Sequence, residues 1–330
     1  MAFSLFSSKN RIINFVINDH CIRFLELKQA KPPIAQRWSE RTFPPGIVSD
    51  GKIMDADSLA NILEECMDEW KIHRRSIRFI VPDPLVIIRT ISVPAEIQDD
   101  ELRGYLYLEL GSSIHLPFEE PVFDFYQLES NEKTKTLLLF AAPEEEVMKY
   151  VNLFEGVKLN PIAADISPLA LYRLYDQLVQ APEGEVLFAI QMDLTSVNLS
   201  IFDGSVPLVM RQSPLPYNVE DWELKRDRSG LTTYVYKGNR EELSFMLKEL
   251  YREINKLLDY YKYSLNNANK DVTRFLLNGD HPMLKSMGDE LKGRFDTPVT
   301  FLSLNKNSLE DSGNVPPNFF LSLGLALKEV

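Results

Sequence analysis

The feature that most constrains the fold is a pattern of elements that occurs twice along the chain. In each half, polar turns separate three short runs of branched and aromatic residues, and helical segments follow them. A turn-rich segment, Ala181-Pro182-Glu183-Gly184, lies between the two halves. We therefore predict an α/β protein with two similar lobes, residues 1–182 and residues 183–330. The six expected strand runs are residues 12–17, 22–27, 34–43, 186–192, 197–202 and 206–211.

Apolar residues at helical spacing predict the helices. The strongest pattern covers residues 240–266, where Asn239 is a suitable N-cap and Glu242 follows it three residues later. The apolar stripe of this segment, from Leu243 to Leu265, indicates core packing rather than a cofactor site. The remaining helices are expected at residues 58–70, 96–113, 144–153, 167–180, 283–291 and 319–328.

The net charge argues against two classes of partner. The 48 acidic and 36 basic side chains give a formal charge of −12, which repels phosphate backbones and anionic lipid headgroups. No apolar stretch approaches the roughly 20 residues of a membrane-spanning helix, and the first ten residues lack the pattern of a secretory signal. The two cysteines, Cys21 and Cys66, form no disulfide framework or metal motif. We therefore expect a cytoplasmic protein with no nucleic-acid partner and no direct membrane insertion.

Four stretches, in this order, carry a resemblance to a known family. They are IRFLEL at 22–27, VIIRTISVP at 86–94, Glu109 with LPFEE at 116–120 and Asp124, and the 253–261 helix segment with LLNG at 276–279. Over nearly its whole length the chain resembles the actin-like ATPase superfamily, and within it the type IV pilus assembly PilM family. FtsA and the cytoplasmic domain of the type II secretion protein GspL are relatives of that family. The resemblance implies an actin-like (ribonuclease H-like) two-lobed α/β fold with an inserted α/β subdomain at about residues 94–162.

The resemblance also implies a partner. Members of the family lie at the cytoplasmic face of the inner membrane and bind the short N-terminal tail of a membrane protein, PilN, between the first subdomain and the insert. By that analogy the candidate partner-binding residues here come from the second and third of the four stretches. Arg89 interrupts an apolar strand, and it has an alternative to partner binding. It could form an ion pair with an acid such as Glu109 and so hold the insert in place. The candidates are Arg89, Pro94, Glu109, Pro117 and Phe118.

A nucleotide site of this family needs glycine turns, because a Cβ would block the approach of backbone N–H groups to phosphates, and carboxylates that hold Mg²⁺. The first loop of the family, Asp-Ile-Gly-Ser-Ser-Ser, corresponds here to residues 16–21, VINDHC. Valine therefore replaces the metal-directed aspartate, and Asn18, which tolerates positive φ, replaces the glycine. Asp19 could act in place of the lost carboxylate, although it lies on the turn and out of register.

The other two loops also depart from the family pattern. Asp193-Leu194-Thr195 stands where the family has Asp-Ile-Gly, so the carboxylate remains and Thr195 replaces the glycine. Asn278-Gly279-Asp280 keeps one glycine and places an acid where the second belongs. An unneutralised carboxylate about 4 Å from a phosphate charge costs roughly 4 kcal/mol at an effective dielectric constant of 20. A non-glycine residue in a left-handed turn adds about 1–2 kcal/mol.

These departures predict a remnant nucleotide site formed by Asn18, Asp19, Asp193, Thr195 and Gly279, with no catalytic residue and no metal ligand. We expect no ATP hydrolysis, no resident cofactor, and at most weak binding of ATP and Mg²⁺. The function that follows is a scaffold of type IV pilus biogenesis, recruited to the inner face of the cell membrane by a PilN-like tail. The alternatives are an active actin-like ATPase switch and a cytoplasmic component of a type II secretion system.

Overall fold

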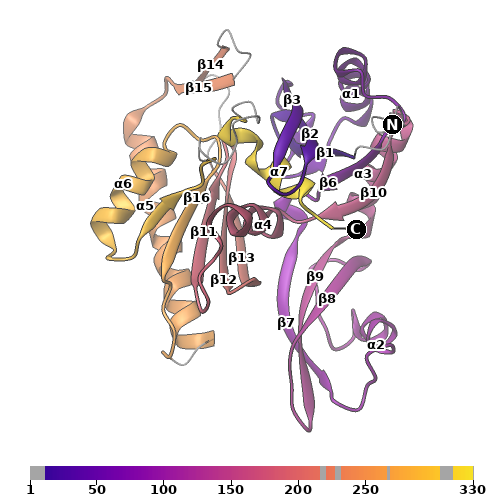
Figure 1. Ribbon diagram of the computed structural model, residues 1–330, viewed down its shortest axis with the longest axis vertical. Helices are drawn as coiled ribbons and strands as arrows, with labels where there is room; N and C mark the ends of the chain where they lie inside the picture. The colour runs from indigo at the N-terminus through magenta and orange to yellow at the C-terminus, as the bar shows by residue number, and fades with distance from the viewer. Residues whose placement is uncertain (1–11, 216–220, 227–231, 266–267, 305–314, 330) are drawn as a thin grey trace, which may run out of the picture.

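The computed structural model describes residues 12–215, 221–226, 232–265, 268–304 and 315–329. The first ten residues, whose composition argues against a secretory signal, lie outside these ranges. Two five-stranded sheets stand side by side, one in each half of the chain (Figure 1). The first has the order β10-β6-β1-β2-β3 and the second the order β13-β12-β11-β16-β17.

The two sheets share one topology. In each sheet, the first three strands in sequence form an antiparallel meander. A fourth strand pairs in parallel with the first strand, and the fifth pairs in parallel with the fourth. This identity confirms the predicted pair of similar α/β lobes. The first sheet consists of β1 (Ile13–Asn18), β2 (Cys21–Gln29), β3 (Ile34–Thr42), β6 (Ser76–Ile80) and β10 (Asn160–Asp165). The second consists of β11 (Val186–Met192), β12 (Ser196–Asp203), β13 (Val206–Pro214), β16 (Arg274–Asn278) and β17 (Val299–Phe301).

Helices cover the outer face of each sheet. On the first lobe, α1 (Ala56–Trp70) and α3 (Glu144–Gly156) bury their apolar stripes against β1, β2 and β6. On the second lobe, α5 (Arg240–Asp259) and α6 (Leu284–Arg294) do the same. The side chain of Asn239 caps α5 as predicted, accepting the N–H of Glu241 at 2.9 Å. A π-helical turn, Tyr260–Leu265, continues α5.

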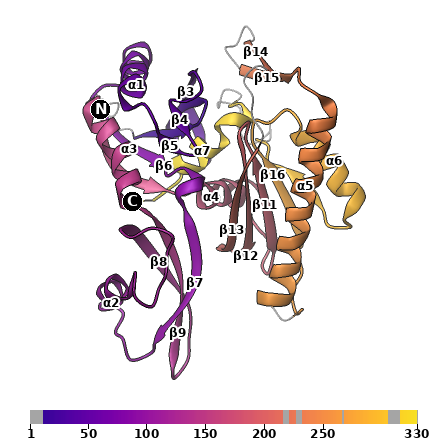
Figure 2. The same ribbon diagram turned by 180° about the vertical axis from the view of Figure 1, so that it is seen from behind.

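Two further helices, α4 (Ser167–Val179) and α7 (Phe320–Ala326), lie between the two sheets (Figures 1 and 2). One apolar cluster joins β2 and α4 to α7 and to the second sheet, so a continuous core connects the lobes. The helices touch at Gly324, where a Cβ would lie 2.0 Å from the carbonyl oxygen of Ala170. Only a residue without a side chain permits this approach of two backbones.

The insert is a separate three-stranded sheet that extends away from the first lobe (Figure 2). Its strands are β7 (Ile87–Pro94), β8 (Pro121–Ser130) and β9 (Thr134–Pro143), in the order β7-β9-β8, and α2 (Leu102–Glu109) packs on one face. We expected the insert at about residues 94–162, whereas its sheet spans Ile87 to Pro143. The helix α3 and strand β10 belong instead to the first lobe, because Val147, Tyr150 and Phe154 lie in that lobe's core.

Two short hairpins complete the fold near the junction of the lobes. The first is β4 (Val48–Ser49) with β5 (Lys52–Ile53), and the second is β14 (Trp222–Arg226) with β15 (Thr232–Tyr236). Within the described ranges, no helix has both the length and the hydropathy needed to cross a membrane.

Candidate functional site

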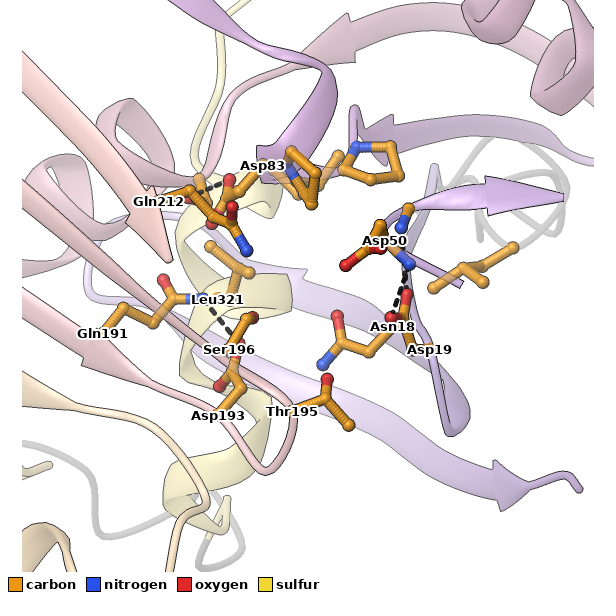
Figure 3. Close-up of a pocket in the computed structure, with 16 residues that line it drawn as sticks. Asn18, Asp19, Asp50, Asp83, Gln191, Asp193, Thr195, Ser196, Gln212 and Leu321 are labelled. Carbon is orange, nitrogen blue, oxygen red and sulfur yellow. Dashed lines mark hydrogen bonds between the residues drawn. The ribbon is translucent and has the colours of Figure 1, made fainter. Parts of the chain in front are cut away.

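A small cavity between the lobes brings together four of the five residues predicted for the nucleotide site. Asn18 ends β1 and Asp19 lies in the turn that follows it, and Asp193 and Thr195 come from the turn between β11 and β12 (Figure 3). Gly279 follows β16 and is not part of the cavity wall. The volume of this cavity is about 40 Å³.

The carboxylate of Asp19 is used by the protein itself. It accepts the backbone N–H of Asp50 at 2.8 Å and that of Gly51 at 3.0 Å, and so fixes the turn between β4 and β5. Gly51 has φ of +71°, and its carbonyl accepts the hydroxyl of the buried Tyr150 at 2.9 Å. Both oxygens of Asp19 therefore have structural partners in the first lobe.

Asp193 and Asp83 place two further carboxylates on the cavity wall. The side-chain amide of Gln191 donates to Asp193 at 3.0 Å, and the hydroxyl of Ser167 donates to Asp83 at 2.5 Å. Burial raises the pKa of Asp193 to about 7, with repulsion from Asp280 as the second cause. Burial likewise raises the pKa of Asp83 to about 6. Removal from water therefore favours the neutral form of both groups.

This arrangement predicts how stability changes with pH. The pKa of Asp193 is raised above its unfolded value near 3.9. Its contribution to the free energy of unfolding is therefore fully present below pH 4 and is lost as the pH rises through about 7. We expect Asp193→Asn to exceed the wild type in unfolding free energy by about 2 kcal/mol at pH 8 and to match it near pH 4. Urea unfolding at both pH values measures this difference. A variant that is less stable than the wild type at pH 8 would contradict it.

The cavity wall is rich in carboxylates. Four carboxylates, those of Asp19, Asp50, Asp83 and Asp193, line the cavity, and no lysine or arginine does so among the described residues. An adjoining space of about 420 Å³ between the Phe43–Gly46 segment and the β14–β15 hairpin also lacks both cations among its described lining. No group of three or more potential metal ligands occurs in the part of the chain that the structure describes.

Gly279 serves packing at the third loop. Its φ is +133°, and a Cβ there would lie 2.0 Å from the carbonyl oxygen of Met192. The glycine thus lets the end of β16 cross close to the end of β11. Retention of this one family glycine is explained by the close contact of two strands, whether or not a nucleotide binds.

The acid after Gly279 joins the two lobes. Asp280 forms a buried ion pair with Arg23 on β2, and the Nε of Arg23 also contacts the carboxylate of Glu40 at 2.5 Å. The ring of His20 lies 3.7 Å from the same oxygen of Asp280. Burial alone would raise the pKa of Asp280, but Arg23 and His20 outweigh it and hold the pKa well below its usual range. The assumption of an unneutralised carboxylate was therefore wrong, because Arg23 neutralises it from the other lobe.

Several residues of the cavity wall were not predicted from the sequence, among them Asp50, Asp83 and Gln191. Asp50 lies in the turn between β4 and β5, Asp83 lies in a short 3₁₀ turn after β6, and Gln191 lies in β11. A signal existed for Asp83, because the flanking prolines in Pro82-Asp83-Pro84 end the strand at the cleft. Asp50 and Gln191 carried no comparable signal.

The partner-binding candidates are divided between two places in the insert. The guanidinium of Arg89 donates to the carbonyl of His115, and Pro117 and Phe118 continue the same loop. The backbone carbonyl of Glu109 closes the start of that loop by accepting three N–H groups. Pro94 lies at the far end of β7, about 17 Å from Arg89 at the usual rise per residue. The structure therefore places four of the five candidates around one loop and Pro94 at the tip of the sheet.

The comparison with protein families decides the identity of the chain. The family model described as type IV pilus assembly protein PilM matches residues 16–215, more than half of the chain. The chain belongs to the PilM family. That match begins in β1 and ends just after β13, so it spans the first two of the three loops and the whole insert, and not the third loop at residues 278–280.

Solved structures agree with this assignment at the level of fold. The PilM–PilN type IV pilus biogenesis complex is similar with a TM-score of 0.75 and 21% identity, over 97% of this chain and 98% of that one. MreB5 of Spiroplasma citri bound to ADP has a TM-score of 0.52 and 10% identity, over 96% and 94% of the two chains. The predicted actin-like, two-lobed fold is confirmed.

Proposed function

We propose that this PilM-family protein is a cytoplasmic scaffold of type IV pilus assembly that binds the N-terminal cytoplasmic tail of a PilN-like inner-membrane protein. One observation carries the proposal: almost the full chain has the fold of a PilM that forms a complex with PilN. Binding of that tail would recruit the protein to the inner face of the membrane. No membrane-spanning helix occurs in the described ranges, so recruitment through a partner fits the structure.

The proposed scaffold works without a nucleotide. Three features support this part of the proposal: the cavity of about 40 Å³, the carboxylate wall without a cation among described residues, and the use of Asp19 by a turn. The Arg23–Asp280 ion pair also ties the lobes together across the position where the third loop would meet a nucleotide. We therefore propose that ATP and Mg²⁺ bind weakly or not at all, and that the chain does not hydrolyse ATP.

We place the tail against the insert, at the loop that Arg89 supports. Pro117 is exposed and Phe118 is half-buried there, and the nearby outer surface of α2 exposes Tyr107 and Leu108 by 73% and 77%. Exposed aromatic and branched side chains of this kind mark protein-binding surfaces. An extended tail could pair with backbone groups of the loop and place its side chains in gaps between these residues.

A matched pair of phenylalanine variants tests the position of the tail. We expect Phe118→Ala to weaken binding of a synthetic peptide with the tail sequence of the PilN-like partner about 10- to 100-fold, because burying such a ring contributes about 1.5–3 kcal/mol. Phe245→Ala is the control, since Phe245 is 63% exposed and lies on α5 in the other lobe. Isothermal titration of the peptide measures both affinities.

The same experiment separates two binding surfaces. One outcome would contradict the placement on the insert: Phe118→Ala binds the peptide as tightly as the wild type does, and Phe245→Ala binds it more weakly. That result would indicate that the tail binds in the apolar groove between α5 and β13. No binding of the tail by the wild-type protein would contradict the proposed function itself.

A further inference from the structure

A second cavity lies between the lobes at the opposite end of the strands from the nucleotide cleft. Ile12 and Asn14, at the start of β1, line it, whereas Ile17 and Asn18, at the end of β1, line the cleft. The helix α4 and the segment after α7 form the rest of the wall, and the space measures about 780 Å³. This volume falls in the range of small-molecule sites.

Three cations gather at this cavity around one carboxylate. Arg173 on α4 is paired with Asp165, and the Nζ of Lys328 lies 3.6 Å from the same buried carboxylate. Arg78 on β6 is the third cation: the charge of Asp165 attracts it, and the charge of Arg173 repels it. Of the two acids in the cavity wall, Asp176 accepts the N–H of Ala181 and Glu329 pairs with Lys31. A backbone N–H does not neutralise a carboxylate, so Asp165 and Asp176 offset two of the three cations and one positive charge remains in excess among these residues, in a protein whose net charge is −12.

Arg78 is the least satisfied of the three cations. Its exposed fraction is 7%, its Nη1 donates to the carbonyl of Ala326 at 3.3 Å, and its Nε has no hydrogen-bond partner. Burial lowers the pKa of Arg78, and the neighbouring Arg173 lowers it further. A buried guanidinium donor without a partner is costly, because burial removes the water that would otherwise satisfy it. Arg78 lines the cavity, so an anion bound there would lie beside its guanidinium.

We propose that Arg78, Arg173 and Lys328 form a binding site for a phosphate group carried by a small organic molecule. A phosphate monoester carries about −1.5 to −2 at neutral pH and has three acceptor oxygens, so it can meet the donors of three cations, whereas a carboxylate has only two oxygens. The planar fork of arginine also suits phosphate oxygens. Leu27, Leu169, Tyr172 and Leu327 supply apolar wall for the organic part of the ligand. The site is separate from the partner surface and from the nucleotide cleft.

The test compares Arg78→Gln with a matched control, Arg252→Gln. Arg252 is 66% exposed on α5 and pairs with Glu249, far from the cavity in the fold. Inorganic phosphate is titrated into each protein, and the dissociation constant is taken from the saturable rise in thermal midpoint. We expect Arg78→Gln to raise the dissociation constant about 10- to 100-fold, since a hydrogen bond to a charged group contributes about 1.5–3 kcal/mol. We expect Arg252→Gln to match the wild type.

Lys328→Gln is a second variant, in case Arg78→Gln does not fold, and we expect it to weaken phosphate binding in the same direction. Equal midpoint shifts in the wild type and Arg78→Gln would show only the general stabilisation by phosphate salts and would overturn the proposal. Two probes then identify the source of the phosphate. Binding of glycerol 3-phosphate that depends on Arg78 indicates a soluble ester, and binding of phosphatidylglycerol vesicles that depends on Arg78 indicates a lipid headgroup. Failure of both probes would also overturn it.

Discussion

Gly324→Ala is expected to lower the free energy of unfolding by about 3 kcal/mol. The added Cβ would lie 2.0 Å from the carbonyl oxygen of Ala170, and both backbones are buried between the two sheets. Overpacking of a rigid core costs typically 1–3 kcal/mol, and here the obstacle is a helix backbone rather than a side chain that could rotate. The helices α4 and α7 would have to separate, and the apolar cluster that joins the lobes would lose contacts with them.

A second glycine supplies the control for this prediction. Gly104 lies within α2, where a Cβ would meet no atom within 4 Å. Gly104→Ala should therefore stabilise the protein by about 0.5–1 kcal/mol through helix propensity alone. Urea unfolding followed by circular dichroism measures both variants. If Gly324→Ala unfolded at the same urea concentration as Gly104→Ala, the close packing of α4 on α7 would be refuted.

Asp280→Ala is expected to destabilise the protein by about 3 kcal/mol, the second large effect. The substitution leaves the buried guanidinium of Arg23 with Glu40 alone and removes the ion pair between the lobes. Breaking one side of a buried pair costs about 3–5 kcal/mol, and the remaining Glu40 places this case at the lower end. Asp124→Ala is the matched control, because Asp124 is 78% exposed and pairs with Arg103 at the surface, where such pairs contribute about 0–1 kcal/mol.

The pH dependence of this effect has a definite sign. The pKa of Asp280 is lowered in the folded state. Its contribution to the free energy of unfolding is therefore present above the unfolded pKa near 3.9 and is lost as the pH falls through the folded pKa. The wild type and Asp280→Ala should therefore differ fully at pH 7 and converge in acid. A difference that persists undiminished at the lowest pH where both proteins fold would mean that the charge of Asp280 is not its cause.

The sequence was sufficient for the architecture because local patterns specify it. The runs at 12–17 and 186–192 form β1 and β11, and the stripe with its Asn239 cap forms α5. The helix expected at 96–113 is shorter, Leu102–Glu109, and at its C-terminal end Gly111, with φ of +89°, begins a loop. The insert boundary was missed at its far end because α3 has the same kind of apolar stripe whether it faces the insert or the first lobe.

The candidate site was predictable in position but not in chemistry. The family loops located Asn18, Asp19, Asp193 and Thr195, and all four line one cavity. What each carboxylate binds depends on residues far away in sequence. Asp19 meets a turn 31 and 32 residues later, and Asp280 meets Arg23 257 residues earlier. No local pattern specifies such pairs, because the topology of two lobes brings them together. The roles of Arg89, Pro94, Glu109, Pro117 and Phe118 in partner binding stay predictions.

The most direct test of the central claim is titration of the PilN-like tail peptide into the purified protein, with and without millimolar Mg-ATP. A scaffold with a lost nucleotide site should bind the peptide with the same affinity in both conditions, and Mg-ATP alone should give no heat of binding. The contrary result is micromolar binding of Mg-ATP that Asp193→Ala abolishes, together with a nucleotide-dependent change in peptide affinity. That outcome would make the protein a nucleotide-gated switch and would contradict a scaffold that works without a nucleotide.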